Sequence, residues 1–127
     1  MLIEEVLEDF KKSIDGLEEV LELEKTKVNR DSAIKRFELC FDLSWKLIKV
    51  YARKEAVECN SPRECIKVAF QLKLIDYNER WFDIIKDRNL VVHIYKEEYA
   101  DEVYSRLKSH LELFEDLSVK IEEKIKI

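Results

Sequence analysis

Residues 2–22, LIEEVLEDFKKSIDGLEEVLE, decide the fold class of this chain. On a charged background, their apolar side chains recur in alternating steps of four and three, at Ile3, Leu7, Phe10, Ile14, Leu17 and Leu21. This spacing places the apolar residues on one face of an α-helix. Gly16 weakens such a helix slightly but leaves the pattern intact. The stretch therefore predicts a long amphipathic helix over about residues 2–22.

The far end of the chain carries the same signal. From about Glu98 a helical face again repeats in steps of three and four. Ser118 occupies one position of this face, and apolar residues occupy the others: Tyr104, Leu107, Leu111, Phe114, Ile121 and Ile125. We expect the two terminal helices to be long packing partners in an up-and-down bundle.

A second helix is expected after a polar connection formed by residues 24–30. Asn29 or Asp31 is a suitable N-cap, since both side chains accept hydrogen bonds from free helical N–H groups. The apolar stripe that follows, from Ala33 to Tyr51, predicts a helix that runs to about Lys54.

Two shorter helices are expected in the middle of the chain. Residues 61–64, SPRE, supply a capping serine, a first-turn proline and a glutamate three residues after the cap, so a third helix should run to about Leu72. A fourth begins near Tyr77. Its last turn is expected to be irregular, because the β-branched Val91 and Val92 follow Leu90.

Composition limits the fold class further. The 127 residues suit one domain, residues 1–127, and with one glycine and one proline the chain lacks the turn punctuation of a sheet protein. We therefore expect a single all-α, five-helix up-and-down bundle. The net charge of −5 means that any contact with RNA must be local. No apolar run approaches the roughly 20 residues that span a bilayer, so we expect no membrane insertion.

The number and spacing of the cysteines predict their redox state and the cellular compartment of the protein. Cys40, Cys59 and Cys65 are odd in number and lack CxxC spacing, and the amino terminus does not resemble a signal peptide. These features predict reduced thiols in a cytoplasmic protein.

Residues 88–95, RNLVVHIY, are the candidate for chemistry. Arg88 offers a charged planar fork that matches phosphate oxygens, and His93 has a side chain that titrates near neutral pH. On a regular helix Asn89 aligns with His93 better than Arg88 does, because positions five apart are offset by roughly 140°. Arg88 and His93 therefore converge only if the chain bends after Val92 or a second subunit contributes the opposite half.

A purely structural explanation of this cluster stays open on spacing alone. In it Arg88 pairs with a nearby acid such as Asp87 or Glu97, His93 caps a helix end, and Tyr95 is half-buried packing.

Other polar residues suggest less. Glu38, Asp42 and Lys46 lie four apart on the second helix, which favours an ion-pair ladder. Two carboxylates without a histidine or third acid are a weak magnesium signal, so we expect no metal and no cofactor. His110 has no acid or thiol partner at a recognisable spacing and is expected to be a packing or surface residue.

The chain resembles a known family in several motifs. Residues 31–38, DSAIKRFE, and 41–46, FDLSWK, resemble the second helix of the HEPN proteins described as nucleotidyltransferase substrate-binding proteins. Residues 61–64, Ala69 with Phe70, Trp81, and residues 88–95 follow in that family's order and approximate spacing. The last of these has the Arg-x4-His-x-Tyr form found in HEPN toxins. The resemblance covers nearly the whole chain.

This resemblance implies a homodimer in which the Arg and His motifs of two protomers meet in a cleft, and a separately encoded minimal nucleotidyltransferase as partner. In HEPN toxins the motif is similar to a metal-independent endoribonuclease site. Arg88 then holds the RNA phosphate, Asn89 orients the phosphate or the imidazole, and His93 shuttles protons for attack by the ribose 2′-hydroxyl. Tyr95 matches the tyrosine to which the partner, acting as antitoxin, adds AMP.

A second activity is also implied by the resemblance: a noncatalytic subunit that presents substrate to the nucleotidyltransferase. Val91 and Val92 depart from the small polar residues that many relatives have before the histidine, which removes possible secondary contacts to phosphate. From the sequence we expect the toxin of a two-gene HEPN toxin and nucleotidyltransferase antitoxin pair, with the substrate-binding subunit as the alternative.

Overall fold

The computed structural model describes residues 2–126, and within that range all regular structure is helical. Its elements are α1 (Ile3–Leu21), α2 (Lys27–Lys54), α3 (Pro62–Gln71), α4 (Arg80–Leu90), a short 3₁₀ turn η1 (Val91–His93), and α5 (Glu97–Ile125). The prediction of an all-α, five-helix fold is confirmed.

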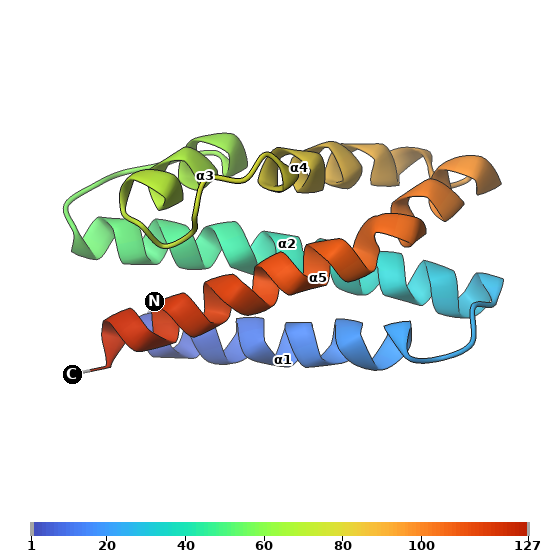
Figure 1. Cartoon of the computed structure of the whole chain (residues 1–127), viewed down its shortest axis with the longest axis horizontal. Helices are drawn as coiled ribbons and strands as arrows, with labels where there is room; N and C mark the ends of the chain where they lie inside the picture. Colours follow the sequence, from blue (N-terminus) through green and yellow to red (C-terminus); the bar gives the residue numbers. More distant parts are fainter. Residues whose placement is uncertain (1, 127) are drawn as a thin grey trace.

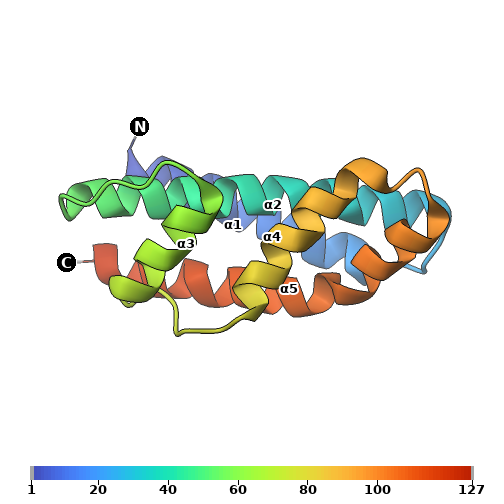
Figure 2. The same cartoon turned by 90° about the horizontal axis from the view of Figure 1, so that it is seen from above.

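The long helices α1, α2 and α5 run side by side, while α3 and α4 are shorter and cover one side of them (Figures 1 and 2). Helices α1 and α5 contact each other, as their matching apolar stripes predicted, and both also pack against α2. The chain reverses direction between α1 and α2, and again between α4 and α5, as in an up-and-down bundle (Figure 1).

One aromatic side chain joins four helices at the centre of the core. Phe114 of α5 is fully buried, and its ring centroid lies 6.0 Å from that of Phe10, 6.2 Å from that of Phe37 and 6.0 Å from that of Trp81. These partners come from α1, α2 and α4. The core is therefore shared by both layers of the bundle.

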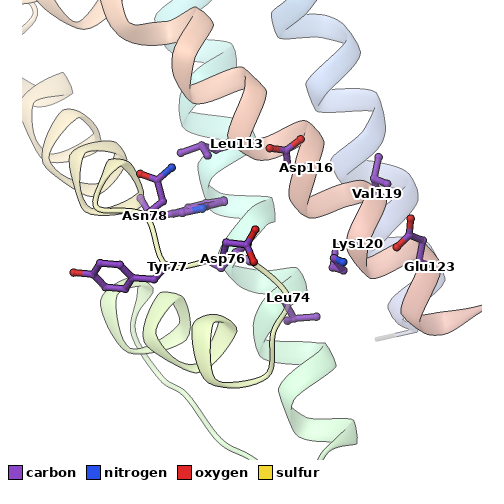
Figure 3. A pocket seen from close by; sticks show the side chains of 11 residues that line it. Leu74, Asp76, Tyr77, Asn78, Leu113, Asp116, Val119, Lys120 and Glu123 are labelled. Atoms are coloured by element: carbon purple, nitrogen blue, oxygen red, sulfur yellow. The ribbon is translucent and has the colours of Figure 1, made fainter.

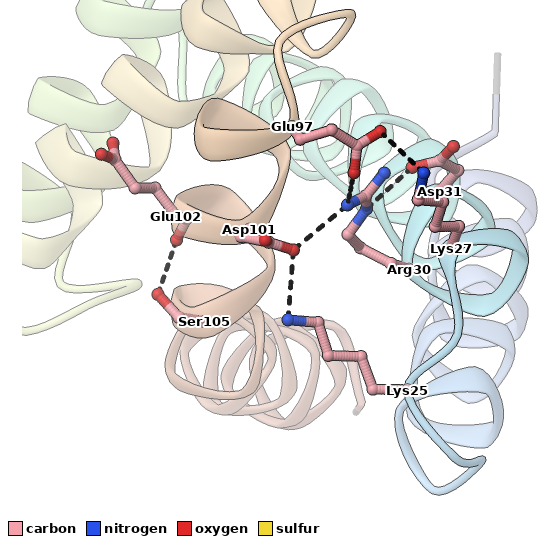
Figure 4. A network of polar contacts seen from close by, with 8 residues as sticks. All are labelled: Lys25, Lys27, Arg30, Asp31, Glu97, Asp101, Glu102 and Ser105. Atoms are coloured by element: carbon pink, nitrogen blue, oxygen red, sulfur yellow. Dashed lines mark hydrogen bonds and ion pairs between the residues drawn. The ribbon is translucent and has the colours of Figure 1, made fainter.

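Helix α2 begins earlier than the sequence suggested. Thr26 is the N-cap, and its Oγ1 accepts a hydrogen bond of 3.0 Å from the backbone N–H of Asn29. The prediction that residues 24–30 form a connection and that Asn29 or Asp31 caps the helix is wrong. The helix starts at Lys27 because Thr26 caps its first turn, and Arg30, only 4% exposed, holds that turn against carboxylates of α5 while Lys27 and Val28 stay exposed (Figure 4).

The start of α3 is as predicted. Ser61 Oγ accepts from the N–H of Glu64 at 3.2 Å, and the Glu64 carboxylate accepts from the N–H of Asn60 at 3.2 Å. Helix α4 begins at Arg80, later than the predicted Tyr77, because the side-chain oxygen of Asn78 accepts from the N–H of Arg80 at 2.9 Å. The predicted irregular last turn of α4 is confirmed as η1.

Two of the three cysteines are joined. Cys59 and Cys65 form a disulfide with their Cα atoms 5.1 Å apart, while Cys40 is free and buried. The prediction that all three are reduced is therefore wrong for this pair. The chain turns at the Ser61 cap, and this turn brings Cys59, which precedes it, next to Cys65 in the first turns of α3.

Within residues 2–126, every helix is too short or too polar to cross a lipid bilayer.

Truncation of the central ring tests this core. Phe114→Ala should lower the free energy of unfolding by about 3–5 kcal/mol, because it leaves a cavity between four helices. Urea denaturation measures the change. The exposed Val119→Ala on the same helix is the control and should stay within about 0.5 kcal/mol of the wild type. A loss below about 1 kcal/mol in Phe114→Ala would contradict the packing described.

Candidate functional site

Arg88 lies in the last turn of α4 and its side chain is 31% exposed. Its closest acid is Glu38 of α2, with Nη2 and Oε2 3.9 Å apart, which is too long for a hydrogen bond. The Nε atom is buried and has no acceptor among the described residues. The suggested pairing of Arg88 with Asp87 or Glu97 is therefore wrong, and most of the hydrogen-bonding capacity of the guanidinium is unused.

Arg88 and the exposed Asn89 line a groove of about 310 Å³ where α2, α4 and the start of α3 meet. The remaining lining residues are Phe41, Asp42, Trp45, Pro62 and Ile85. The groove thus combines the guanidinium and an amide with the side of an indole ring. We call it the Arg88 groove.

His93 and Tyr95 lie beyond the end of α4. His93 is exposed at the end of η1, and its ring centroid lies 6.1 Å from that of Tyr95 and 6.4 Å from that of Tyr99. Tyr95 is 74% exposed, so the suggestion of half-buried packing is wrong. Neither residue lines the Arg88 groove. The described chain therefore presents Arg88 with Asn89, and His93 with Tyr95, as two neighbouring groups.

A buried acid fixes the turn that carries Arg88. The carboxylate of Asp87 accepts hydrogen bonds from Arg106 of α5, from Nε at 2.9 Å and from Nη2 at 2.7 Å. His110 Nε2 lies 2.6 Å from the same carboxylate and donates to it, because an ionised carboxylate can only accept. Burial raises the pKa of Asp87, but the hydrogen bonds from His110 and Arg106 outweigh burial and hold the pKa below its ordinary value.

This cluster was missed from the sequence. His110 was expected to have no acid partner, yet it is bound to Asp87, which lies 23 residues earlier in the chain. The available signal was that Arg106 and His110 are four apart beside the apolar seam of the last helix, which places two donors on one face. Only the packing of α4 on α5 identifies the acid between them.

A second polar network holds the other end of the motif. Arg30 Nη1 donates to Glu97 at 2.6 Å and to Asp101 at 3.1 Å, and Lys25 also pairs with Asp101 at 3.1 Å (Figure 4). Glu97 opens α5, two residues after Tyr95. The exposed segment between α4 and α5 is therefore anchored by Asp87 on one side and by Glu97 on the other.

The predicted ladder on α2 does not form. Among residues 2–126, Asp42 and Lys46 make no ion pair within 4.0 Å, and Glu38 faces Arg88 instead. In the same range no three histidine, cysteine or acidic side chains are grouped as a metal site would require. Lys46 is consequently left facing solvent.

A further groove of about 400 Å³ lies between the connection from α3 to α4 and the C-terminal half of α5 (Figure 3). Trp81 contributes to its lining, and the charged residues that line it are mainly acidic: Asp76, Asp116 and Glu123, with Lys120 as the one basic residue. It shares no lining residue with the Arg88 groove and is electrostatically unsuited to an anionic ligand.

These features define a small helical-bundle protein that displays an arginine and histidine motif at the end of its fourth helix. The chain belongs to the family described as nucleotidyltransferase substrate binding protein like, whose model matches residues 5–123. A crystal structure of a protein from Thermus thermophilus is similar, with 35% sequence identity and a TM-score of 0.80, over 85% of this chain and 94% of that one. No curated protein matches the sequence significantly.

The buried acid predicts a specific dependence of stability on pH. Since the folded-state pKa of Asp87 is below its ordinary value of 3.8, the unfolded chain binds more protons there and the stabilisation is lost as the pH falls through the folded-state pKa. Asp87→Asn should cost about 1–3 kcal/mol at neutral pH. The difference from wild type should shrink below about pH 4.

Urea denaturation at a series of pH values measures this difference. Asp83→Asn, an exposed change on the same helix, is the matched control and should follow the wild type. A deficit of Asp87→Asn that stays constant down to about pH 2 would show that the ionised carboxylate is not the stabilising group.

Proposed function

We propose that this chain is the substrate-binding subunit of a two-component nucleotidyltransferase. Family membership supports this function. The observation that carries it is the composition of the Arg88 groove, which offers an anion-binding fork, an amide and an aromatic surface, while His93 lies outside it. Such a groove is suited to binding an anionic substrate. The chemistry then belongs to a separately encoded minimal nucleotidyltransferase.

The substrate that suits the groove carries a phosphate. A guanidinium binds phosphate oxygens through paired N–H donors, and such charge-assisted hydrogen bonds are stronger than neutral ones. Arg88 Nη2 and Glu38 Oε2 lie 3.9 Å apart and form no hydrogen bond. An incoming phosphate therefore binds the guanidinium without breaking a hydrogen bond to Glu38. Asn89 adds amide donors at the edge of the same groove.

The test uses the chain together with the nucleotidyltransferase of its own genome. Arg88→Gln should raise KM for nucleotidyl transfer to the bound substrate about tenfold or more, with kcat little changed, because it removes charged hydrogen bonds made in the ground state. Steady-state kinetics with purified components measures both constants. Lys86→Gln, an exposed change on the same helix, is the control. Transfer that is independent of this chain would contradict the proposal.

A second candidate is the metal-independent endoribonuclease of a HEPN toxin, with the nucleotidyltransferase as antitoxin. The exposure of His93 favours it, since a second protomer of a homodimer has access to that imidazole. Arg88 of one protomer would then stabilise the charge on an RNA phosphate and His93 of the other would transfer protons. Asn89 would orient the phosphate. The exposed Tyr95 would accept AMP, adding negative charge that repels RNA.

The two candidates differ in one measurement. Purified protein, shown by mass spectrometry to be unmodified at Tyr95, is incubated with mixed tRNA and mRNA in EDTA, and the product ends are analysed. A binding subunit leaves the RNA intact. EDTA-resistant cleavage that is lost in both Arg88→Ala and His93→Ala, in variants whose oligomeric state by sedimentation is unchanged, would replace the binding function with the nuclease.

A further inference from the structure

The outward face of α2 forms a third groove, of about 460 Å³. All its lining residues belong to one helical stripe, since they recur at steps of one, three and four along α2: Asp42, Trp45, Lys46, Lys49, Val50 and Arg53. We call these residues the α2 stripe. No role has been assigned to it in the function proposed above.

The stripe is positively charged and its charges are available. Lys46, Lys49 and Arg53 make no ion pair within 4.0 Å to any of the residues that the structure describes, and Asp42 is the one acid of the stripe. The chain as a whole carries a net charge of −5. Basic residues grouped along one helix of an acidic protein are a local electrostatic footprint, which attracts a polyanion to this face.

The stripe is continuous with the Arg88 groove. Asp42 and Trp45 line both grooves, so they form the boundary between them. From that boundary to Arg53 the helix extends for roughly 16 Å at its standard rise per residue. An extended ligand that places one anionic group at Arg88 therefore meets Trp45 next, and then the three cations in turn.

We propose that the α2 stripe binds a single strand of nucleic acid that continues from the phosphate held at Arg88. Lys46, Lys49 and Arg53 neutralise successive phosphates, and a base stacks on the partly exposed ring of Trp45. Proteins that hold single strands combine these two elements, a basic track and an aromatic platform. The inference rests on the proposed binding function of Arg88 and specifies the class of its substrate.

A second copy of the chain fits the stripe less well. In a two-fold symmetric dimer centred on this stripe, the cations of one protomer would face those of its partner. The cores of protein interfaces are depleted of lysine and enriched in large apolar side chains. The strongly exposed apolar residues of the described chain, such as Leu39, Val92 and Tyr95, all lie outside the stripe.

The experiment measures binding of a fluorescent single-stranded oligonucleotide of about 12 nucleotides by anisotropy, at several salt concentrations between about 50 and 200 mM. The triple variant Lys46→Gln, Lys49→Gln, Arg53→Gln should weaken binding on the order of a hundredfold at about 0.1 M salt. It should also lower the slope of log affinity against log salt by about 2, since each lost phosphate contact removes roughly 0.7. The matched control removes three exposed lysines from α1 and α5, Lys12→Gln, Lys108→Gln and Lys124→Gln, and should change affinity and slope far less.

Trp45 supplies an independent readout. Trp81 is 1% exposed, so quenching of tryptophan fluorescence by the oligonucleotide should come from Trp45 and should disappear in Trp45→Phe. Circular dichroism confirms that each variant is folded.

The possible outcomes separate this inference from the proposed function. If Arg88→Gln weakens oligonucleotide binding but the stripe variant behaves like its control, the Arg88 site stands and the α2 stripe is rejected. If the wild type binds no oligonucleotide, the stripe is likewise rejected, whereas the nucleotidyl-transfer kinetics still decide the role of Arg88. If the stripe variant alters sedimentation instead of binding, the stripe is an interface between copies and the inference is overturned.

Discussion

The whole bundle depends on the burial of α2 against the other helices, since α1, α3, α4 and α5 all contact it. Phe37 shows how complete this burial is: it is 0% exposed, its ring meets Phe114 of α5, and it stacks on His110 at 5.5 Å. A helix covered on most sides has only a narrow solvent-facing strip. In the C-terminal half of α2 that strip carries Trp45 and three cations, Lys46, Lys49 and Arg53, so the packing that builds the core leaves these charges on one outer face.

The candidate site is held by polar contacts that are costly to bury. Taking Asp87 out of water is unfavourable, and the bonds from Arg106 and His110 offset that cost only because their geometry is good. These contacts make the packing specific. The Asp87 carboxylate reaches all of its donors only when α4 has one rotation about its axis and one position along α5. Arg88 follows Asp87 directly, so its direction is set by the same constraint. The Arg30 network does the equivalent work at the start of α5.

Arg88 and His93, the two residues proposed for binding and for proton transfer, lie in two different places in the described chain. Arg88 shares its groove with Asn89 and Trp45, whereas His93 lies on η1 beside Tyr95. The break in the helix after Leu90 is the physical cause, because the tighter 3₁₀ turn carries the histidine beyond the groove. In the proposed function the Arg88 groove holds a phosphate and the chemistry is left to the nucleotidyltransferase, whereas the nuclease alternative needs the His93 of a second copy.

The sequence by itself determined the helical class, the long terminal helices, the Ser61 start of α3 and the irregular end of α4, because these follow from local periodicity, capping and β-branching. It also singled out Arg88 to Tyr95 as a candidate site, which stays a prediction. Tertiary structure decided the rest. The burial of Arg30 in the first turn of α2 depends on carboxylates of α5, the Asp87 partners are contributed from another helix, and Asp42 and Lys46 stay apart. Contacts between residues distant in the chain leave no periodic signal, so only the packed bundle could identify them.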